Sequence, residues 1–170
     1  MDDLDFNDGV VLRPLARADL SVLREATLLN MNWSEERFSE KDISDDPHTS
    51  HYTALDPERG DFGFLLTDSD GWVSVVWLLF LGRDDPGYGY VREGVPEVSI
   101  CTAPQHRGRG YGRSLLVHAV ESARNRGLHA ISLSVEKGNP ARTFYERLGF
   151  VSVPEAQCEG TMILELSPVG

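Results

Sequence analysis

A turn rich in glycine and arginine lies between a short apolar segment and a long amphipathic one. The turn runs Gln105-His-Arg-Gly-Arg-Gly-Tyr-Gly-Arg113. The apolar segment before it, 97–102, predicts a strand halted by Pro104. The segment after it, 110–126, repeats apolar residues at helical spacing and is followed by Gly127, so it predicts a helix. The fold must therefore contain a strand that leads directly into a helix.

The composition of this turn suits a phosphate-binding loop. Three glycines let the backbone approach a ligand closely, and the start of the helix offers unpaired N–H groups at the positive end of its dipole. Arg107, Arg109 and Arg113 add positive charge. Together these features predict a pyrophosphate site. The alternative is a turn that binds nothing.

Two common phosphate motifs do not fit the turn. A P-loop requires Gly-Lys-Ser/Thr after its second glycine, and the sequence has no such run here. A dinucleotide fingerprint, Gly-x-Gly-x-x-Gly, fails because its third glycine would fall on Arg113 or Leu115. The turn therefore belongs to neither class.

The rest of the chain predicts a mixed α/β domain with an incompletely parallel sheet. Asp19 and Ser34 are each expected to cap a helix, and 68–71 has the chemistry of a hairpin turn. Two polar segments, 45–59 and 82–96, are interpreted as loops. The expected strands are 10–15, 62–67, 72–81, 97–102, 130–135, 150–153 and 161–166, and a further short helix is expected at 140–148.

Length and charge limit the classes of function. The 170 residues fit a single domain over 1–170, with an ordinary globular composition. The net charge is −11, but 105–147 holds eight basic against three acidic residues. Non-specific nucleic-acid binding needs a broad basic face, so no nucleic-acid partner is expected. One basic segment in an acidic shell suits a small polyanion, with a cationic second ligand elsewhere.

Neither a membrane nor a secreted location is expected. The longest apolar run, Val73 to Leu81, is far shorter than the ~20 residues that span a bilayer. Residues 1–8 are acidic and lack the apolar core of a signal peptide. The cytoplasm is then the expected compartment, and Cys101 and Cys158 are expected to be reduced thiols.

Two linked motifs carry a resemblance to a known family. Gln105-x-x-Gly108-x-Gly110 resembles the acyl-CoA signature of the GNAT superfamily of N-acetyltransferases. The segment 97–104 resembles the family's central strand, and 133–150 resembles its second motif. The resemblance implies a GNAT-like α/β fold. Its central sheet is mixed and mostly antiparallel, with about six to seven strands and helices on both faces.

The resemblance implies acetyl-CoA as cosubstrate, and direct transfer of the acetyl group to a primary amine in one ternary complex. Backbone N–H groups of the family's central strand, freed by a bulge, polarise the acetyl carbonyl. The basic turn is expected to hold the 3′,5′-ADP end. Asn139 is expected to hydrogen-bond the pantetheine or the strand carbonyls, and the alternative is that it only caps the helix that Pro140 begins. The expected cofactor-binding residues are Ile100, Cys101, Thr102, Gln105, Arg107, Gly108, Arg109, Gly110, Tyr111, Gly112, Arg113, Asn139 and Arg142.

Two side chains are the catalytic candidates that the resemblance implies. Tyr145 is the candidate general acid, because a phenol is protonated at neutral pH. The alternative is a core aromatic residue beside Phe144. Glu97 is the candidate base, acting directly or through water; the alternative is an exposed or purely substrate-binding glutamate. Glu93 is a poorer candidate base.

Two other chemistries have weaker support. His48 and His51 stand three residues apart, but no third ligand has suitable spacing, so no metal site is expected. Cys101 lies on the acyl-binding strand, where an acetyl-cysteine route is conceivable. No His/Asp partner is recognisable for it, and the family does not generally use such a route.

The acceptor site is implied to lie between the first two helices and the loop before the central strand. Asn32, Trp33, Tyr88 and Tyr90 are its candidate binding residues. Trp33 has an alternative interpretation, a hydrophobic staple ahead of a helix capped by Ser34. The acidic surroundings favour a cationic acceptor, so the expected partner is a primary amine on a small molecule or peptide.

Three alternatives to acetyl transfer stay open. A catalytically silent acyl-CoA-binding sensor would keep the turn without turnover, and a transferase could use another acyl-CoA donor. An interaction protein would bind no CoA. The oligomeric state is also open: an exposed edge strand at 161–166 would pair in a homodimer, and a monomer is the other interpretation.

Overall fold

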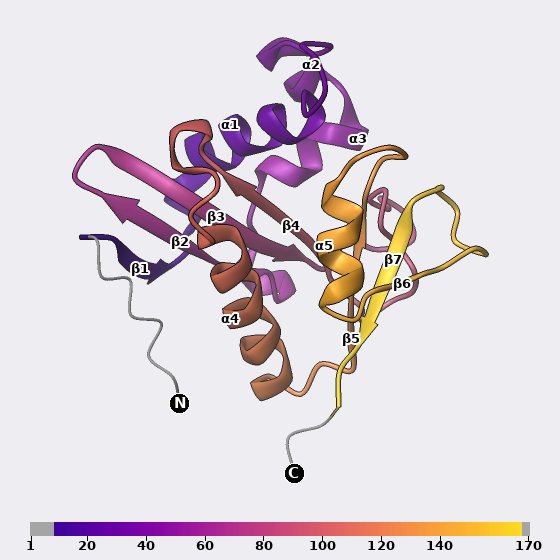
Figure 1. The fold of residues 1–170 in the computed structure, drawn as a ribbon. Coiled ribbons are helices and arrows are strands. Elements are labelled where there is room, and N and C mark those ends of the chain that lie inside the picture. The colour runs from indigo at the N-terminus through magenta and orange to yellow at the C-terminus, as the bar shows by residue number, and fades with distance from the viewer. Residues whose placement is uncertain (1–8, 168–170) are drawn as a thin grey trace.

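A seven-stranded sheet organises residues 9–167, the part of the chain that the computed structural model describes (Figure 1). The strand order is β1-β2-β3-β4-β5-β7-β6. Within these residues β4 and β5 are parallel and the other neighbouring pairs are antiparallel. The strands are β1 (Val11–Pro14), β2 (Phe62–Asp68), β3 (Gly71–Leu79), β4 (Glu97–Thr102), β5 (Ala130–Ser134), β6 (Val151–Ser152) and β7 (Thr161–Glu165). The expected mixed, mostly antiparallel sheet is confirmed.

Helices cover both faces of this sheet (Figure 1). One face carries α1 (Leu20–Met31), with α2 (Glu40–Asp45) and α3 (Pro47–Ser50) beside it. The other face carries α4 (Tyr111–Asn125) and α5 (Ala141–Arg147). Four short 3-10 turns complete the fold: η1 (Arg17–Asp19), η2 (His51–Thr53), η3 (Pro57–Arg59) and η4 (Pro104–His106).

Strand β3 shows why the sheet needs both layers. Successive side chains of a strand point to opposite faces. Val75 and Trp77 pack into the apolar cluster that includes α1, and Val76 and Leu78 pack into the cluster that includes α4. All four are at most 1% exposed. A strand that is apolar on both sides needs a covering layer on each face, and in this fold helices supply both layers.

The hairpin turn at 68–71 is confirmed. The Asp68 side chain accepts hydrogen bonds from the backbone N–H groups of Asp70 (2.8 Å) and Gly71 (3.1 Å), as expected of aspartate in a turn. Asp19 precedes α1, as expected, but its side chain does not cap the helix. Its carboxylate pairs with Arg13 and accepts from the Ala16 N–H instead.

The helix expected after Ser34 is wrong. The next helix, α2, begins at Glu40 and is capped by Ser39. Ser39 Oγ accepts from the Asp42 N–H at 3.2 Å, and the Asp42 carboxylate accepts from the Ser39 N–H at 2.8 Å. This reciprocal pair needs an acidic or amide side chain three residues after the cap. Ser34 has Arg37 at that position, so it cannot form one.

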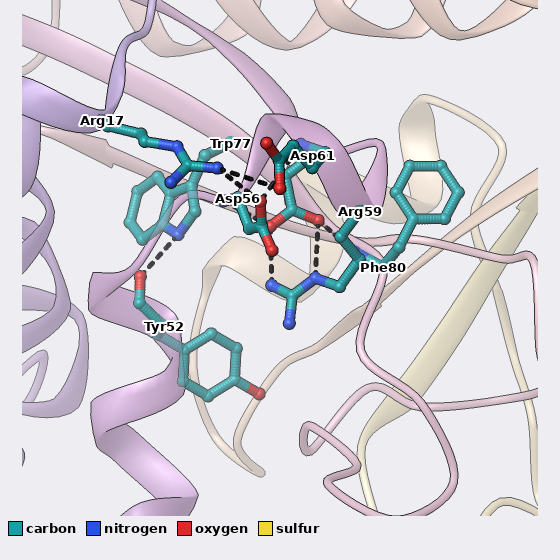
Figure 2. Close-up of polar contacts among 8 residues, drawn as sticks. Arg17, Tyr52, Asp56, Arg59, Asp61, Trp77 and Phe80 are labelled. Carbon is teal, nitrogen blue, oxygen red and sulfur yellow. Dashed lines mark hydrogen bonds and ion pairs between the residues drawn. The ribbon is translucent and has the colours of Figure 1, made fainter.

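The polar segment 45–59 is not a loop, because it contains α3, η2 and η3. Two contacts attach it to the sheet (Figure 2). Trp77 Nε1 on β3 donates to the Tyr52 carbonyl at 2.9 Å. The buried Asp61 carboxylate accepts from the Arg59 guanidinium at 2.6 and 3.1 Å and from the Phe80 N–H at 2.8 Å. Tyr52 therefore sits in a fixed turn that packs against α1.

The C-terminal strand is not an edge of the sheet. β7 lies between β5 and β6, because Val151 and Ser152 of β6 pair with Ile163 and Met162. The edge strand on this side is therefore the two-residue β6, and the expected exposed edge at 161–166 is wrong.

Strands β4 and β5 diverge after a short parallel contact. Their pairing is confined to Glu97 and Ser132, with the Ser132 N–H donating to the Pro96 carbonyl at 3.0 Å. The β3–β4 register runs without a shift from Glu97 to Thr102, so the bulge expected in the central strand is wrong. The register shift of this sheet lies between β2 and β3, at Leu66 and Thr67. The opening between β4 and β5 therefore arises because the two strands diverge after Glu97 and Ser132, without a bulge in β4.

Two other findings concern the location and the thiols. None of the helices within residues 9–167 has the length and apolar character that a membrane crossing needs. Residues 1–8, whose sequence was considered for a signal peptide, lie outside the described part. Cys101 and Cys158 are both free.

Candidate active site

A cavity of about 710 Å³ lies where β4 and β5 diverge. It collects residues from α1, β4, β5, α4 and α5 and from the loops between them. The sequence-predicted site residues that line it are Trp33, Tyr88, Glu97, Ile100, Cys101, Thr102, Arg107, Gly112, Arg113, Asn139 and Tyr145. Both catalytic candidates therefore share one cavity with part of the basic turn.

Some predicted residues do not line the cavity. Gln105, Gly108, Arg109 and Gly110 lie in the exposed turn that continues from Arg107. This turn is next to the cavity in the chain, so it can hold a ligand that extends beyond it.

Four further predicted residues are engaged in the protein itself. The Tyr111 ring is buried in the core on the α4 face, so the ring itself does not line the cavity. The Arg142 guanidinium bonds Glu146 and Ser152. The Asn32 side chain accepts from the N–H groups of Arg37 and Phe38, both at 2.9 Å, and so shapes the loop after α1. The Tyr90 hydroxyl lies 3.4 Å from Glu93 Oε1.

The turn before α4 is open to a ligand. Gly108 and Gly110 have φ of +80° and +81°, in the left-handed region that glycine adopts readily. A Cβ placed on either glycine would meet no atom within 4 Å. Within residues 9–167, Arg109 and Arg113 form no ion pair, so their charges are available. A helix start, two glycines and unpaired guanidinium groups suit a polyanion.

The open edge of β4 faces the cavity. Ala103 N–H donates to the Val73 carbonyl at 2.9 Å, and antiparallel pairs alternate, so the peptide groups of Cys101 also face β3. Those of Ile100 and Thr102 face the gap instead. Their carbonyls accept from Asn30 Nδ2 (3.0 Å) and Arg107 Nε (3.3 Å), and their N–H groups point to the cavity side. Cys101 therefore contributes no backbone donor there.

Glu97 is a buried carboxylate at the opposite end of β4. It is 5% exposed, which contradicts the interpretation as an exposed strand-start residue. Its Oε1 accepts from the Tyr52 hydroxyl at 2.8 Å and from the Gly89 N–H at 2.9 Å. Its Oε2 is shielded from solvent and has no partner among residues 9–167. Burial raises the pKa of Glu97 from its ordinary 4.5 to about 7, although both hydrogen bonds oppose the rise.

Tyr145 combines core packing with access to the cavity. Its ring packs against Phe144 and Phe150, with centroids 5.4 and 5.9 Å away, and it also lines the cavity. Its hydroxyl has no hydrogen-bond partner in the described part of the chain. Burial, with a smaller effect of the Cys101 thiol, raises the pKa of Tyr145 to about 12. The phenol is therefore a proton donor throughout the neutral range.

The structure gives no support to an acetyl-cysteine route through Cys101 or to a metal site at His48 and His51. Burial raises the pKa of the Cys101 thiol to about 12, so the nucleophilic thiolate is scarce at neutral pH. His51 Nδ1 lies 2.9 Å from Asp85 Oδ1. No group of three metal-ligating side chains occurs within the described range.

A bridge of side chains crosses the cavity between the loop after α1 and the turn after β5. Glu136, after β5, accepts from Trp33 Nε1 at 2.8 Å and from both terminal nitrogens of Arg37 at 2.8 and 2.9 Å. The Arg37 guanidinium, and then the Trp33 indole, lower the pKa of Glu136 to about 2. Trp33 is therefore no staple, since Ser34 begins no helix. It ties the loop after α1 to the turn before α5.

Sequence reasoning missed three residues of the site, Tyr52, Arg37 and Glu136, and it missed the contact that Asn30 makes with the Ile100 carbonyl. Tyr52 lies in a polar segment with no periodic pattern, and Asn30 reaches Ile100, 70 residues away. Glu136 and Arg37 pair across 99 residues. No local signal in the sequence marks such long-range partners.

A family model described as the acetyltransferase (GNAT) family matches residues 26–150, most of the chain and nearly all of the site. The chain belongs to this GNAT family. It is therefore an acyltransferase by family, and the fold described above is the one that the resemblance implied.

The names of relatives with similar sequences specify different substrates. This GNAT acetyltransferase is 28% identical over 158 residues to a spermidine N(1)-acetyltransferase of Vibrio cholerae, covering 86% of this chain and 81% of that protein. It is 49% identical over 52 residues to a streptothricin acetyltransferase of Streptomyces lavendulae, but that match covers only 30% of this chain and 28% of the relative.

Solved structures agree in fold. A GNAT-family acetyltransferase of Staphylococcus aureus Mu50 aligns with a TM-score of 0.68 at 14% identity, over 93% of this chain and 99% of that one. The Vibrio cholerae spermidine N-acetyltransferase, solved with CoA and spermine, aligns with a TM-score of 0.57 at 24% identity, over 94% and 96%. A putative acetyltransferase of Salmonella typhimurium, solved with acetyl-CoA, has a TM-score of 0.62 at 18% identity, over 94% and 95%.

Proposed function

We propose that this protein transfers the acetyl group of acetyl-CoA to a primary amine, by direct attack within one ternary complex. One observation carries the proposal: a single cavity joins an open strand edge and a basic turn to a buried carboxylate and a phenol. Glu97 and Thr102 lie at opposite ends of β4, about 17 Å apart at the usual rise per residue. The cavity is long enough for two substrates to meet end to end.

The turn and the β4 edge are proposed to bind acetyl-CoA, which supplies an acetyl thioester. The N–H groups at the start of α4, with Arg107, Arg109 and Arg113, would neutralise its phosphates. The N–H groups of Ile100 and Thr102 would donate to the pantetheine arm and the acetyl oxygen. Gln105, Gly108, Gly110, Tyr111, Gly112 and Asn139 complete the proposed site, whereas Cys101 would contribute only its side chain.

Glu97 and Tyr145 are proposed to move the protons. An amine attacks only when neutral, so a base must take its proton, and Glu97 is the buried carboxylate of the cavity. Oε2 of Glu97 has no hydrogen-bond partner among residues 9–167, so it is the oxygen left to receive this proton, directly or through a water. Tyr145 would donate to the departing thiolate, since its hydroxyl stays protonated and has no partner within residues 9–167.

The acceptor is proposed to enter on the α1 face. Trp33 and Tyr88 line the cavity there together with the Glu97 carboxyl group, whereas the charge of Glu136 is balanced by Arg37. Aromatic walls and carboxylates favour a cationic amine. The spermidine acetyltransferase relative acts, by its name, on such an amine, which supports this class of acceptor.

A thermal-shift titration with acetyl-CoA, using NAD and ATP as controls, tests the cofactor assignment first. Ligand at ~100 times Kd adds ~2.7 kcal/mol to the native state, which raises the Tm by a few degrees. The expected result is a rise with acetyl-CoA alone. CoA release is then measured across a panel of amines, with propionyl-CoA and succinyl-CoA as alternative donors. Binding without release for any amine would support a silent sensor and overturn the proposal.

Gly110→Ala is expected to weaken acetyl-CoA binding at least tenfold by calorimetry. The new Cβ enters space where the ligand's phosphates are proposed to lie, at a backbone angle that disfavours alanine. Gly127→Ala is the matched control. Gly127 has φ of +79° and the same open surroundings, but it lies at the other end of α4. Equal binding by both variants would show that the turn is not the phosphate site.

A further inference from the structure

The surroundings of Glu97 come from three separate parts of the chain. β4 carries the residue itself, η2 supplies the Tyr52 hydroxyl at 2.8 Å, and the loop before β4 supplies the Gly89 N–H at 2.9 Å. The same loop also reaches Tyr52, because the Tyr88 N–H donates to the Tyr52 hydroxyl at 2.8 Å. Tyr52 therefore joins the carboxylate to the loop that covers it.

The directions of these hydrogen bonds are fixed by chemistry. A backbone N–H can only donate, so the Tyr52 oxygen accepts from Tyr88 and its single proton is left for Glu97. Gly89 N–H also donates to the same carboxylate oxygen. The Oε1 atom is thus engaged by two donors. A proton taken up by Glu97 is favoured on Oε2, because a proton on Oε1 would leave the Tyr52 hydroxyl proton without its acceptor.

The loop is built to approach this carboxylate closely. A Cβ on Gly87 would lie 1.8 Å from Glu97 Oε2 and 2.7 Å from the Tyr52 hydroxyl. A Cβ on Gly89 would lie 2.8 Å from Oε1 and 2.6 Å from the Leu133 carbonyl carbon. A Cβ at Gly89 would overlap backbone atoms, and a Cβ at Gly87 would displace the Glu97 carboxylate from its position. The two glycines therefore bring the backbone donors into range while keeping larger groups away from Oε2.

We propose that Tyr52 is a positioning residue, which fixes the Glu97 carboxylate so that Oε2 is the oxygen that receives the proton of the acceptor amine. The proposal rests on the proposed function, in which Glu97 is the base. No bond other than the N–H of the amine is broken in this step: the proton passes to Oε2, directly or by way of water, and the nitrogen keeps its electron pair for attack on the acetyl carbon.

Tyr52 is itself held firmly. Figure 2 shows its carbonyl bonded to Trp77 Nε1, with the phenol ring extending away from that bond. The Tyr88 ring stacks on it at a centroid distance of 6.2 Å and an angle of 15°. The His51 ring, whose Nδ1 pairs with Asp85, meets it edge-on at 4.5 Å. A hydroxyl on such a support can orient a carboxylate.

The electrostatics agree with this geometry. Burial alone would favour a neutral Glu97, and the hydrogen bond from Tyr52 is the first of the two interactions that lower its pKa again. The titratable side chains that face Glu97 are Tyr52 on η2 and Tyr88 on the loop. Burial raises the pKa of both phenols, so both stay neutral where Glu97 titrates. Loss of the Tyr52 hydroxyl should therefore shift the titration of Glu97 to higher pH.

The test compares Tyr52→Phe with Thr53→Val. Both variants lose one buried hydroxyl of the same short turn, but the Thr53 hydroxyl bonds the Ser50 carbonyl at 2.7 Å and does not bond Glu97. The Glu97 carboxyl carbon is titrated by NMR, and kcat/KM is measured against pH. In Tyr52→Phe both curves are expected to move together to higher pH, with a roughly tenfold loss of kcat/KM at pH 7. Thr53→Val is expected to move neither.

Failure of this proposal and failure of the proposed function give different results. An unchanged Glu97 titration in Tyr52→Phe overturns the role of Tyr52. A titration that moves while the kcat/KM profile stays in place overturns Glu97 as the base, and with it the proposed function. Should Tyr52→Phe fail to fold, the wild-type protein provides the test. The Tyr52 hydroxyl proton is then expected as a slowly exchanging NMR resonance that follows the Glu97 titration, and a resonance indifferent to pH overturns the proposal.

Discussion

Glu97→Gln is expected to lower kcat by about 10²- to 10⁴-fold, the range typical of a lost general base. Glutamine has the shape of glutamate, and its carbonyl oxygen can still accept from the Tyr52 hydroxyl and the Gly89 N–H. The variant therefore keeps its fold and loses only the ability to take up a proton. Steady-state release of CoA at saturating acetyl-CoA measures the effect.

Glu93→Gln is the matched control for this variant. The Glu93 carboxylate is exposed, and its Oε1 accepts from the Arg83 N–H at 2.9 Å, within the loop before β4. It therefore lies outside the cavity and is expected to leave kcat within about twofold of wild type. A Glu97→Gln enzyme as fast as this control would remove Glu97 from the mechanism.

The pH dependence provides a second signature of Glu97. Only the carboxylate form accepts a proton, so the kcat/KM of the wild-type enzyme is expected to rise with pH and level off above about pH 7. The Glu97→Gln variant lacks this rise. Tyr145 titrates at about 12, so it adds no fall on the alkaline side within ordinary buffers.

Glu97 also makes the stability of the fold depend on pH. Its pKa is raised from 4.5 to about 7, so its contribution is fully present below pH 4.5 and is lost as pH rises through 7. The wild type is expected to lose about 3 kcal/mol of unfolding free energy over this interval, and Glu97→Gln is not. Urea unfolding at pH 5 and pH 8 measures both slopes. Parallel behaviour of the two proteins would contradict the raised pKa.

The features that sequence reasoning predicted well are local. The strand–turn–helix around Gly110, the hairpin at 68–71 and the helix over Tyr111–Asn125 follow from spacing and turn chemistry within a few residues. Glu97 and Tyr145 were identified through motifs that adjoin such elements, and the structure places both in one cavity. Their roles remain proposals.

The features that sequence reasoning missed depend on contacts between residues far apart in the chain. Tyr52 lies next to α3, a helix of four residues, which is too short for an apolar period to appear. The Tyr52 carbonyl accepts from Trp77, 25 residues away, and its hydroxyl donates to Glu97, 45 residues away. The start of the second helix is the exception, because the sequence does distinguish the two serines: Ser39 has the acidic Asp42 at the third following position, whereas Ser34 has Arg37.

Tyr145→Phe is expected to lower kcat about 10²-fold while the Kd for acetyl-CoA changes less than threefold. The two side chains pack alike against Phe144 and Phe150, and the lost hydroxyl has no partner among residues 9–167. Removing an unpaired hydroxyl costs little stability, so the Tm is expected to stay within a few degrees of wild type. Kinetics with acetyl-CoA and calorimetry separate the two effects.

The choice of leaving group shows whether the Tyr145 hydroxyl acts as an acid. A thiolate that is already a weak base needs no proton to depart, so an acetyl donor with an aryl thiol should be used almost equally well by Tyr145→Phe and by wild type. The alkyl thiol of CoA should show the full loss. An equal loss with both donors would mean that the phenol supports the cavity wall and gives up no proton. Because its pKa is about 12, Tyr145 stays protonated at every pH where the comparison is made.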